Sequence, residues 1–186
     1  MSIAEAQRDV RRVYAGGFYG QLVSGAVWLG AAAAATWFSP PVAVGVLFFG
    51  GVLIFPLTTL VIRLSGRPSS LPAGHPMAGL SMQIAFTVPI GFVVVVAMLG
   101  GRSELFFPAS MVIVGAHYLP FVFLYGMRLF AVLSAAMVVI GVLFLYGMPV
   151  PSAVGGWITG ALLVAFAFLL RASAHSLENT ASTGGR

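Results

Sequence analysis

The stretch VAVGVLFFGGVLIFPLTTLVIRL, residues 42–64, decides the fold. Its only charged residue is Arg63, which stands next to its end. A run of about 20 apolar residues forms a helix long enough to cross a bilayer hydrocarbon core of about 30 Å. The stretch therefore predicts a membrane-spanning helix.

The rest of the chain repeats this pattern. The sequence is 60% hydrophobic and only 7% charged, whereas soluble domains carry about 25% charged residues. We therefore expect an all-α integral membrane bundle of six transmembrane helices, connected as three serial hairpins. The five further spans are expected at residues 17–38, 80–99, 105–126, 129–146 and 153–170.

Both ends of the chain differ from the spans. Ser2 and Glu5 form a capping-box pattern, and the apolar residues that follow recur at helical spacing opposite three arginines. Residues 1–15 are therefore predicted to form a short cytoplasmic interfacial helix, with a frayed charged tail as the alternative. The transmembrane domain is expected over residues 16–171. The small polar residues of 172–186 predict a disordered cytoplasmic tail.

The arginines fix the expected orientation. The formal charge of +5 comes from arginine alone, because the chain has no lysine. If the spans alternate, every arginine except Arg102 lies on one side of the membrane, and short arginine-rich loops are typical of the cytoplasmic side. Both termini are therefore predicted to be cytoplasmic. The arginines stand singly and form no basic stripe, which argues against nucleic-acid binding.

Composition also excludes several kinds of chemistry. The absence of cysteine excludes disulfides and sulfur ligands for a metal. The four acidic residues lie outside the spans, and no catalytic motif is present. We therefore expect no enzyme, no cofactor and no metal site.

His117 is the most informative single residue. It is expected near the middle of the bilayer, where an ionisable side chain indicates a functional site. The alternative is a neutral imidazole that joins two helices by a hydrogen bond. On a continuous helix Arg128 would lie about 20° from His117 around the axis, and so share its face. For Arg128 the alternative is an anchor that reaches the lipid headgroups.

Other polar residues are predicted to join His117. Gln21 and Ser24 share a face of the first span, and Gln83 lies at the depth of Gln21 in the third. Because an amide in lipid is costly without a partner, these side chains are predicted to form a cytoplasm-facing polar cavity with Tyr125, and with Arg128 at its mouth. Hydrogen bonding between helices is the alternative for each amide.

Prolines and small residues indicate how the helices pack. Pro56, Pro89 and Pro120 lie inside spans, where they free backbone carbonyls that can line a cavity. Small residues four apart favour close helix packing, either within one bundle or between protomers of a homo-oligomer. The residues assigned to such packing are Gly16, Gly20, Gly156 and Gly160.

Three segments carry a resemblance to known sequences: EAQRDVRR at residues 5–12, FFGGVLIFPL at 48–57 and YGMR at 125–128. Together they resemble an uncharacterised bacterial family of small multi-pass membrane proteins. The resemblance implies a six-helix architecture, and it carries no substrate, cofactor or catalytic residue. We expect this bundle in a bacterial inner (plasma) membrane. In architecture alone the hairpins also resemble acid-resistance membrane proteins with three tandem hairpins.

The functional expectation follows from the cavity. The chain is expected to be a small transporter- or channel-like protein in the lipid bilayer, a homo-oligomer that takes an unknown small solute or ion. The alternative is a non-transporting membrane scaffold or stress-response accessory protein. A solvated cavity that reaches His117 favours the first hypothesis, and a dry core with every polar group paired favours the second.

Overall fold

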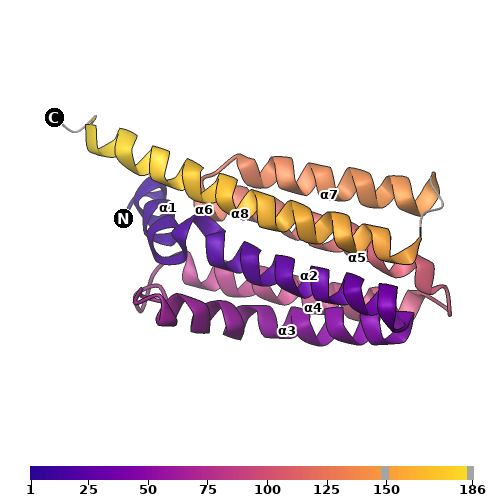
Figure 1. The fold of residues 1–186 in the computed structure, drawn as a ribbon. Coiled ribbons are helices and arrows are strands. Elements are labelled where there is room, and N and C mark those ends of the chain that lie inside the picture. The colour runs from indigo at the N-terminus through magenta and orange to yellow at the C-terminus, as the bar shows by residue number, and fades with distance from the viewer. Residues whose placement is uncertain (148–150, 184–186) are drawn as a thin grey trace.

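The computed structural model describes residues 1–147 and 151–183, and this part of the chain contains helices and no strand (Figure 1). Its described residues include six helical segments that are long and apolar enough to cross a membrane, as predicted. The elements are α1 (Ile3–Tyr14), η1 (Ala15–Gly17), α2 (Phe18–Trp37), α3 (Pro40–Leu64), α4 (Ala78–Met98), η2 (Ser103–Leu105), α5 (Phe106–His117), α6 (Leu119–Tyr125), α7 (Leu129–Tyr146) and α8 (Ser152–Thr183).

The stretch that decides the fold is α3. It begins at Pro40, because the fixed φ and missing N–H of proline suit the first turn of a helix. Its outer face carries large apolar side chains such as Phe49, which is 67% exposed, and Leu53, which is 50% exposed. An apolar surface of this kind is suited to contact with lipid.

The fourth crossing, Ser103–Tyr125, is interrupted, which corrects the expectation of one continuous helix. α5 ends at His117 and α6 begins at Leu119. Pro120 has no N–H to donate to the carbonyl four residues earlier, so it favours a break at this point. α6 then ends at Gly126, whose φ of 64° is left-handed.

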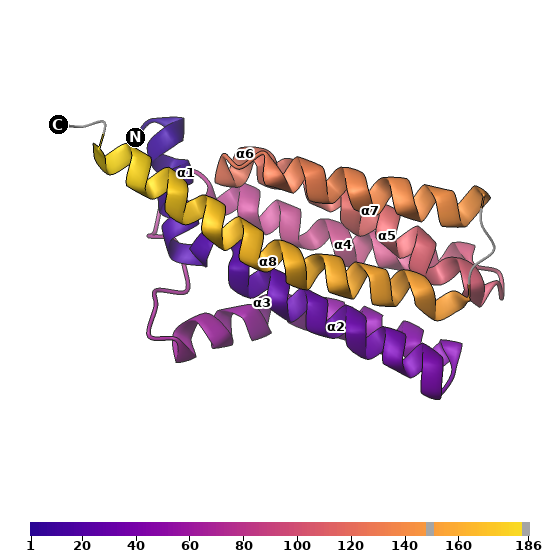
Figure 2. The same cartoon turned by 45° about the horizontal axis from the view of Figure 1, so that its top comes forward.

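Helix packing follows the chain order only in part. α2 packs extensively against α8 and α3, and α5 packs against α7. Figure 2 shows α8 running beside α2. The pairs α3–α4 and α7–α8 make far fewer contacts. The six crossings are connected as three hairpins, but α7 and α8 have their main partners outside their own hairpin.

The capping box at the start of α1 is confirmed. The Ser2 hydroxyl accepts a hydrogen bond from the Glu5 N–H at 3.3 Å, and the Ser2 N–H donates to the Glu5 carboxylate at 2.6 Å. Ala6 and Val10, on the predicted apolar face, are buried, whereas Ile3 is 59% exposed. The part of the apolar face that Ala6 and Val10 form therefore packs against the protein itself.

A left-handed turn separates α1 from α2. Ala15, Gly16 and Gly17 have φ values of 49°, 66° and 92°, a conformation that glycine adopts without strain from a side chain. The turn directs α1 across the end of the bundle (Figure 1).

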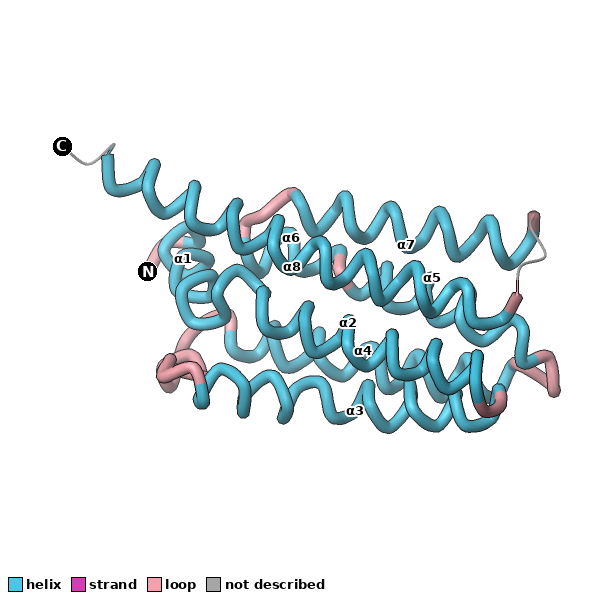
Figure 3. Tube along the Cα trace, viewed as in Figure 1, coloured by secondary structure: helices cyan, strands magenta, loops and turns pink. Residues whose placement is uncertain are grey.

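The arginines gather at one end of the bundle, as the predicted topology requires. α1, the loop of residues 65–77, the α6–α7 connection and the end of α8 lie at this end, and the loop of residues 99–102 lies at the other (Figure 3). We call the first the arginine-rich end. Arg186 lies outside the described residues.

The predicted disordered tail is wrong for residues 172–183. α8 continues to Thr183, and Ala174 is buried. The small polar composition indicated disorder, but alanine and other helix-compatible residues extend a helix that the membrane span has already nucleated. Residues 184–186 lie outside the described part of the chain.

Candidate functional site

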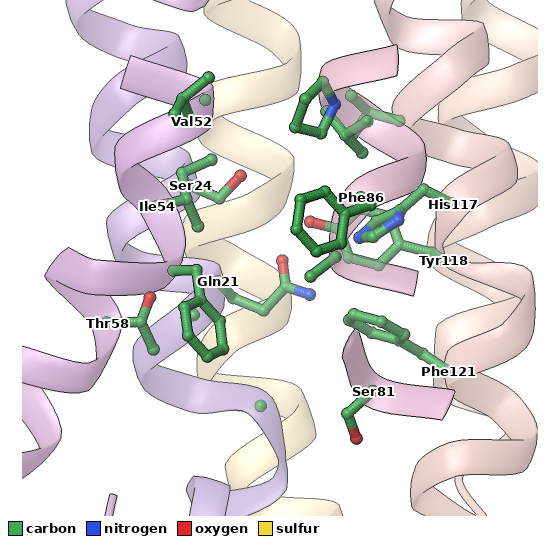
Figure 4. A pocket seen from close by; sticks show the side chains of 18 of the residues that line it. Gln21, Ser24, Val52, Ile54, Thr58, Ser81, Phe86, His117, Tyr118 and Phe121 are labelled. Atoms are coloured by element: carbon green, nitrogen blue, oxygen red, sulfur yellow. The ribbon is translucent and has the colours of Figure 1, made fainter. Parts of the chain in front are cut away.

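A cavity of about 400 Å³ lies between α2, α3, α4, α5 and α6 (Figure 4). Small-molecule sites usually have volumes of about 300–1,000 Å³. The cavity runs from Tyr14 and Gly17 at the arginine-rich end to Trp28 near the middle of α2. Its walls are mostly apolar, which corrects the expectation of a polar cavity.

A polar cluster stands on one wall of the cavity. Gln21 and Ser24 lie three residues apart on α2, so both point to the same side. They are 2% and 5% exposed. Both side chains interact with the hydroxyl of Tyr118, which lies at the α5–α6 break. The break therefore brings a buried phenol to face α2.

Two buried side-chain oxygens on the cavity walls have no hydrogen-bond partner. They are Gln21 Oε1 and Thr58 Oγ1, and both residues line the cavity. Figure 4 shows the two side chains on neighbouring helices beside the cavity. Since a buried polar atom without a partner costs about 1–3 kcal/mol, native structures contain few of them. These two atoms are candidates for binding a ligand.

His117 joins α5 to α4. Its Nδ1 lies 2.8 Å from Thr87 Oγ1, and the Thr87 hydroxyl donates its own hydrogen to the Ile84 carbonyl at 2.7 Å. Because a hydroxyl has one hydrogen, Nδ1 must be the donor in the second bond. The neutral ring then keeps a lone pair on Nε2. The hydrogen bond to Thr87 agrees with the structural interpretation of His117. Because His117 also lines the cavity, ligand binding stays a prediction for it.

The prolines of α3 and α4 free two backbone carbonyls of residues that line the cavity. Pro56 and Pro89 both line the cavity. Neither has an N–H to donate to the carbonyl four residues before it, which belongs to Val52 and Ala85 respectively. Val52 and Ala85 also line the cavity. The predicted link between span prolines and a cavity is therefore present at two of the three prolines.

The structure leaves Gln83 and Arg128 outside the cavity, and both side chains are exposed. The prediction for Gln83 is wrong because α4 faces the cavity with Met82, Ala85, Phe86 and Pro89. At 100° per residue, Gln83 lies on another side of that helix. For Arg128 the helical extrapolation from His117 fails because the chain is interrupted at Tyr118 and again at Gly126.

Three of the four predicted packing glycines lie at close contacts within the chain. A Cβ on Gly156 would lie 2.9 Å from Ala32 Cβ, and one on Gly160 would lie 2.6 Å from Leu29 Cγ, so both face α2. Gly16 belongs to the left-handed turn, and a Cβ there would lie 2.7 Å from Ala174 Cβ. Gly20 lines the cavity, and a Cβ there would lie 3.9 Å from Thr58 Cγ2 of α3, an ordinary van der Waals distance.

α1 closes the arginine-rich end over α6. The last carbonyls of a helix have no partner within the helix. In α6, the Phe123 carbonyl accepts a hydrogen bond from Gln7 Nε2 at 2.6 Å, and the Tyr125 carbonyl accepts one from Arg11. Tyr125 is buried and lines the cavity, so α1 fixes the part of α6 that forms the end of the cavity.

Sequence reasoning missed the threonines of the site. Thr58 and Thr87 lie in apolar runs, where a hydroxyl commonly bonds to a carbonyl of its own helix and gives no sign of another role. Thr59 does this with the Phe55 carbonyl at 2.9 Å. The only sequence signal is their position two residues from Pro56 and Pro89.

Comparisons with known proteins place the chain in a family. It matches no curated protein and no solved structure. The profile described as a family of unknown function (DUF7010) matches residues 3–173, which include the whole cavity, the first five crossings and most of the sixth. The chain therefore belongs to this family of unknown function.

Proposed function

We propose that the protein is a transporter- or channel-like membrane protein whose substrate site is the cavity lined by α2, α3, α4, α5 and α6. One observation carries the proposal: Gln21 Oε1 is buried in the cavity wall without a hydrogen-bond partner. Its position on a cavity wall favours a substrate site over a scaffold, whose core is most stable with every polar group paired. A substrate that fills the cavity supplies the missing partner.

The proposal includes an orientation. The arginine-rich end faces the cytoplasm, because short arginine-rich segments are retained there. Both termini then lie on that side of a bacterial inner (plasma) membrane. We also propose a homo-oligomer, although Gly156 and Gly160 are not its interface because they face α2 of the same chain. No catalytic step is proposed.

Cysteine labelling tests the cavity directly, since the chain has no cysteine of its own. Ser24→Cys places a thiol on the cavity wall. The matched control is Ser110→Cys, on α5, because Ser110 is 0% exposed and does not line the cavity. We expect a small methanethiosulfonate reagent to modify Ser24→Cys and to leave Ser110→Cys unmodified in the folded protein.

A ligand screen completes the test. A compound from a panel of ions and metabolites that raises the thermal unfolding temperature should also slow the labelling of Ser24→Cys. If both cysteines remain unmodified and no compound has an effect, the core is dry and the scaffold hypothesis is favoured.

A further inference from the structure

We propose that the cavity takes a neutral amphiphile with one hydrogen-bond-donating head group, and that this molecule enters from the bilayer between α3 and α4. The inference rests on the proposed function for the site and adds the class of substrate and its route.

The cavity is open on its α3–α4 side. Five residues of these two helices line the cavity and are also exposed. They are Pro56 and four large apolar residues, Val52 (48%), Phe55 (53%), Met82 (48%) and Phe86 (58%). The wall on the opposite side, which includes Trp28 and Tyr118, is buried. α3 contacts α4 much less than it contacts α2. The opening therefore lies between α3 and α4.

The opening lies at the depth of the lipid chains. Val52 is the middle residue of α3, and Phe86 is two residues from the middle of α4. At a rise of about 1.5 Å per residue, both lie within about 3 Å of the middle of their helices. The hydrocarbon core extends about 15 Å to each side. A molecule that passes this opening therefore comes from the acyl-chain region and has an apolar body.

The unpaired oxygens define the head group. Gln21 Oε1 can only accept a hydrogen bond, and Thr58 Oγ1 is free to accept one. His117 Nε2 is a third acceptor, because Nδ1 is the ring's donor. Among the described residues that line the cavity, none is Asp, Glu, Lys or Arg. A charged head group would have no counter-ion there, whereas a hydroxyl would have acceptors.

The positions of Gln21 and Thr58 along their helices indicate how the ligand is oriented in the cavity. Gln21 and Thr58 lie about six residues from the middle of α2 and α3, toward the arginine-rich end. That displacement is about 9–10 Å along each helix. The hydroxyl then lies between Gln21 and Thr58, and the apolar body extends past Phe86 to the opening.

Photocrosslinking in lipid nanodiscs tests the assignment. The probe is a sixteen-carbon primary alcohol with a diazirine near the end of its chain. The competitors are the unlabelled alcohol, its methyl ether, the carboxylate and the trimethylammonium compound of the same chain length. We expect crosslinks at Val52, Phe86 and their cavity-lining neighbours. The alcohol should compete about tenfold better than the ether, the effect of about one hydrogen bond to a buried acceptor.

Two matched variants isolate the head-group contact. Gln21→Leu removes one of the two unpaired oxygens and should reduce the tenfold difference between the alcohol and the ether. Gln83→Leu makes the same change on the exposed side of α4 and should leave the tenfold difference intact. Comparison of their thermal unfolding temperatures shows whether either variant is misfolded. Should Gln21→Leu fail to fold, Thr58→Val tests the second acceptor in the same way.

Several outcomes would overturn the inference. Crosslinks spread evenly over the lipid-facing helices would mean bulk lipid only. If the ether competes as well as the alcohol, or a charged compound competes better, the ligand does not have a neutral, hydrogen-bond-donating head group. A crosslink from Val52→Cys to a second copy of the chain would show that another protomer covers the opening. If a water-soluble compound protects Ser24→Cys while the alcohol does not, the proposed function stands and this inference fails.

Discussion

Adding one methyl group at Gly160 tests the close contact between α2 and α8. A Cβ at this position would lie 2.6 Å from Leu29 Cγ and Cδ2 and 3.1 Å from the Leu29 backbone nitrogen. Leu29 Cγ and Cδ2 can move by rotation of the side chain, but the backbone nitrogen moves only if the helix moves. Gly160→Ala should therefore separate α2 from α8 locally.

The cost follows from those contacts. Overpacking by a methylene-sized group typically costs about 1–3 kcal/mol. The gain in helix propensity from Gly to Ala, about 1 kcal/mol, offsets part of it. We expect a net loss of about 1 kcal/mol, which lowers the thermal unfolding temperature by about 2–4 °C in a chain of this size. Gly45→Ala in α3 is the matched control, because no atom lies within 4 Å of the added Cβ.

Thermal unfolding in one detergent, scanned at one rate, measures both variants against the parent protein. Gly45→Ala should unfold at the parent temperature or above it, and Gly160→Ala below it. If the two variants unfold at the same temperature, the α2–α8 contact is not as close as described and the packing argument fails.

Two further predictions concern the membrane topology and the His117 ring. Arg67→Cys and Arg102→Cys should react with a membrane-impermeant thiol reagent from opposite sides of the membrane; reaction from the same side would refute the six-crossing topology. Thr87→Val should remove the partner of the His117 Nδ1–H and lower stability by about 1 kcal/mol, whereas Thr59→Val, which removes a bond within α3 alone, should have a smaller effect. Imidazole ¹⁵N shifts should show the Nδ1–H tautomer in the parent, and an Nε2–H ring there would contradict the assignment.

The sequence was sufficient to predict the crossings because lipid imposes a simple length rule on apolar helices. Residues 42–64 become α3 with the same end and a start two residues earlier. The capping box at Ser2 was readable for a similar reason, since it depends on residues three positions apart. The partners of α7 and α8 were not readable, because chain order does not determine which helices pack together.

The sequence predicted part of the site, because Gln21, Ser24, His117 and Tyr125 line the cavity. Gln21 and Ser24 lie on one unbroken stretch of α2, and both line the cavity as expected. Arg128 was extrapolated through a break and a left-handed glycine, so its predicted direction was wrong. Gln83 was placed by depth alone, which does not determine the side of the helix on which a residue lies.

The buried Ala174 has a practical consequence for shortened versions of the protein. Its methyl group packs against Gly16, in the turn that sets the direction of α1. The sequence alone predicted that the transmembrane domain ends at Arg171. A chain shortened to that residue would lose Ala174 and its contact with this turn. Deletions and fusions at the carboxyl end should therefore keep the helix at least through Ala174.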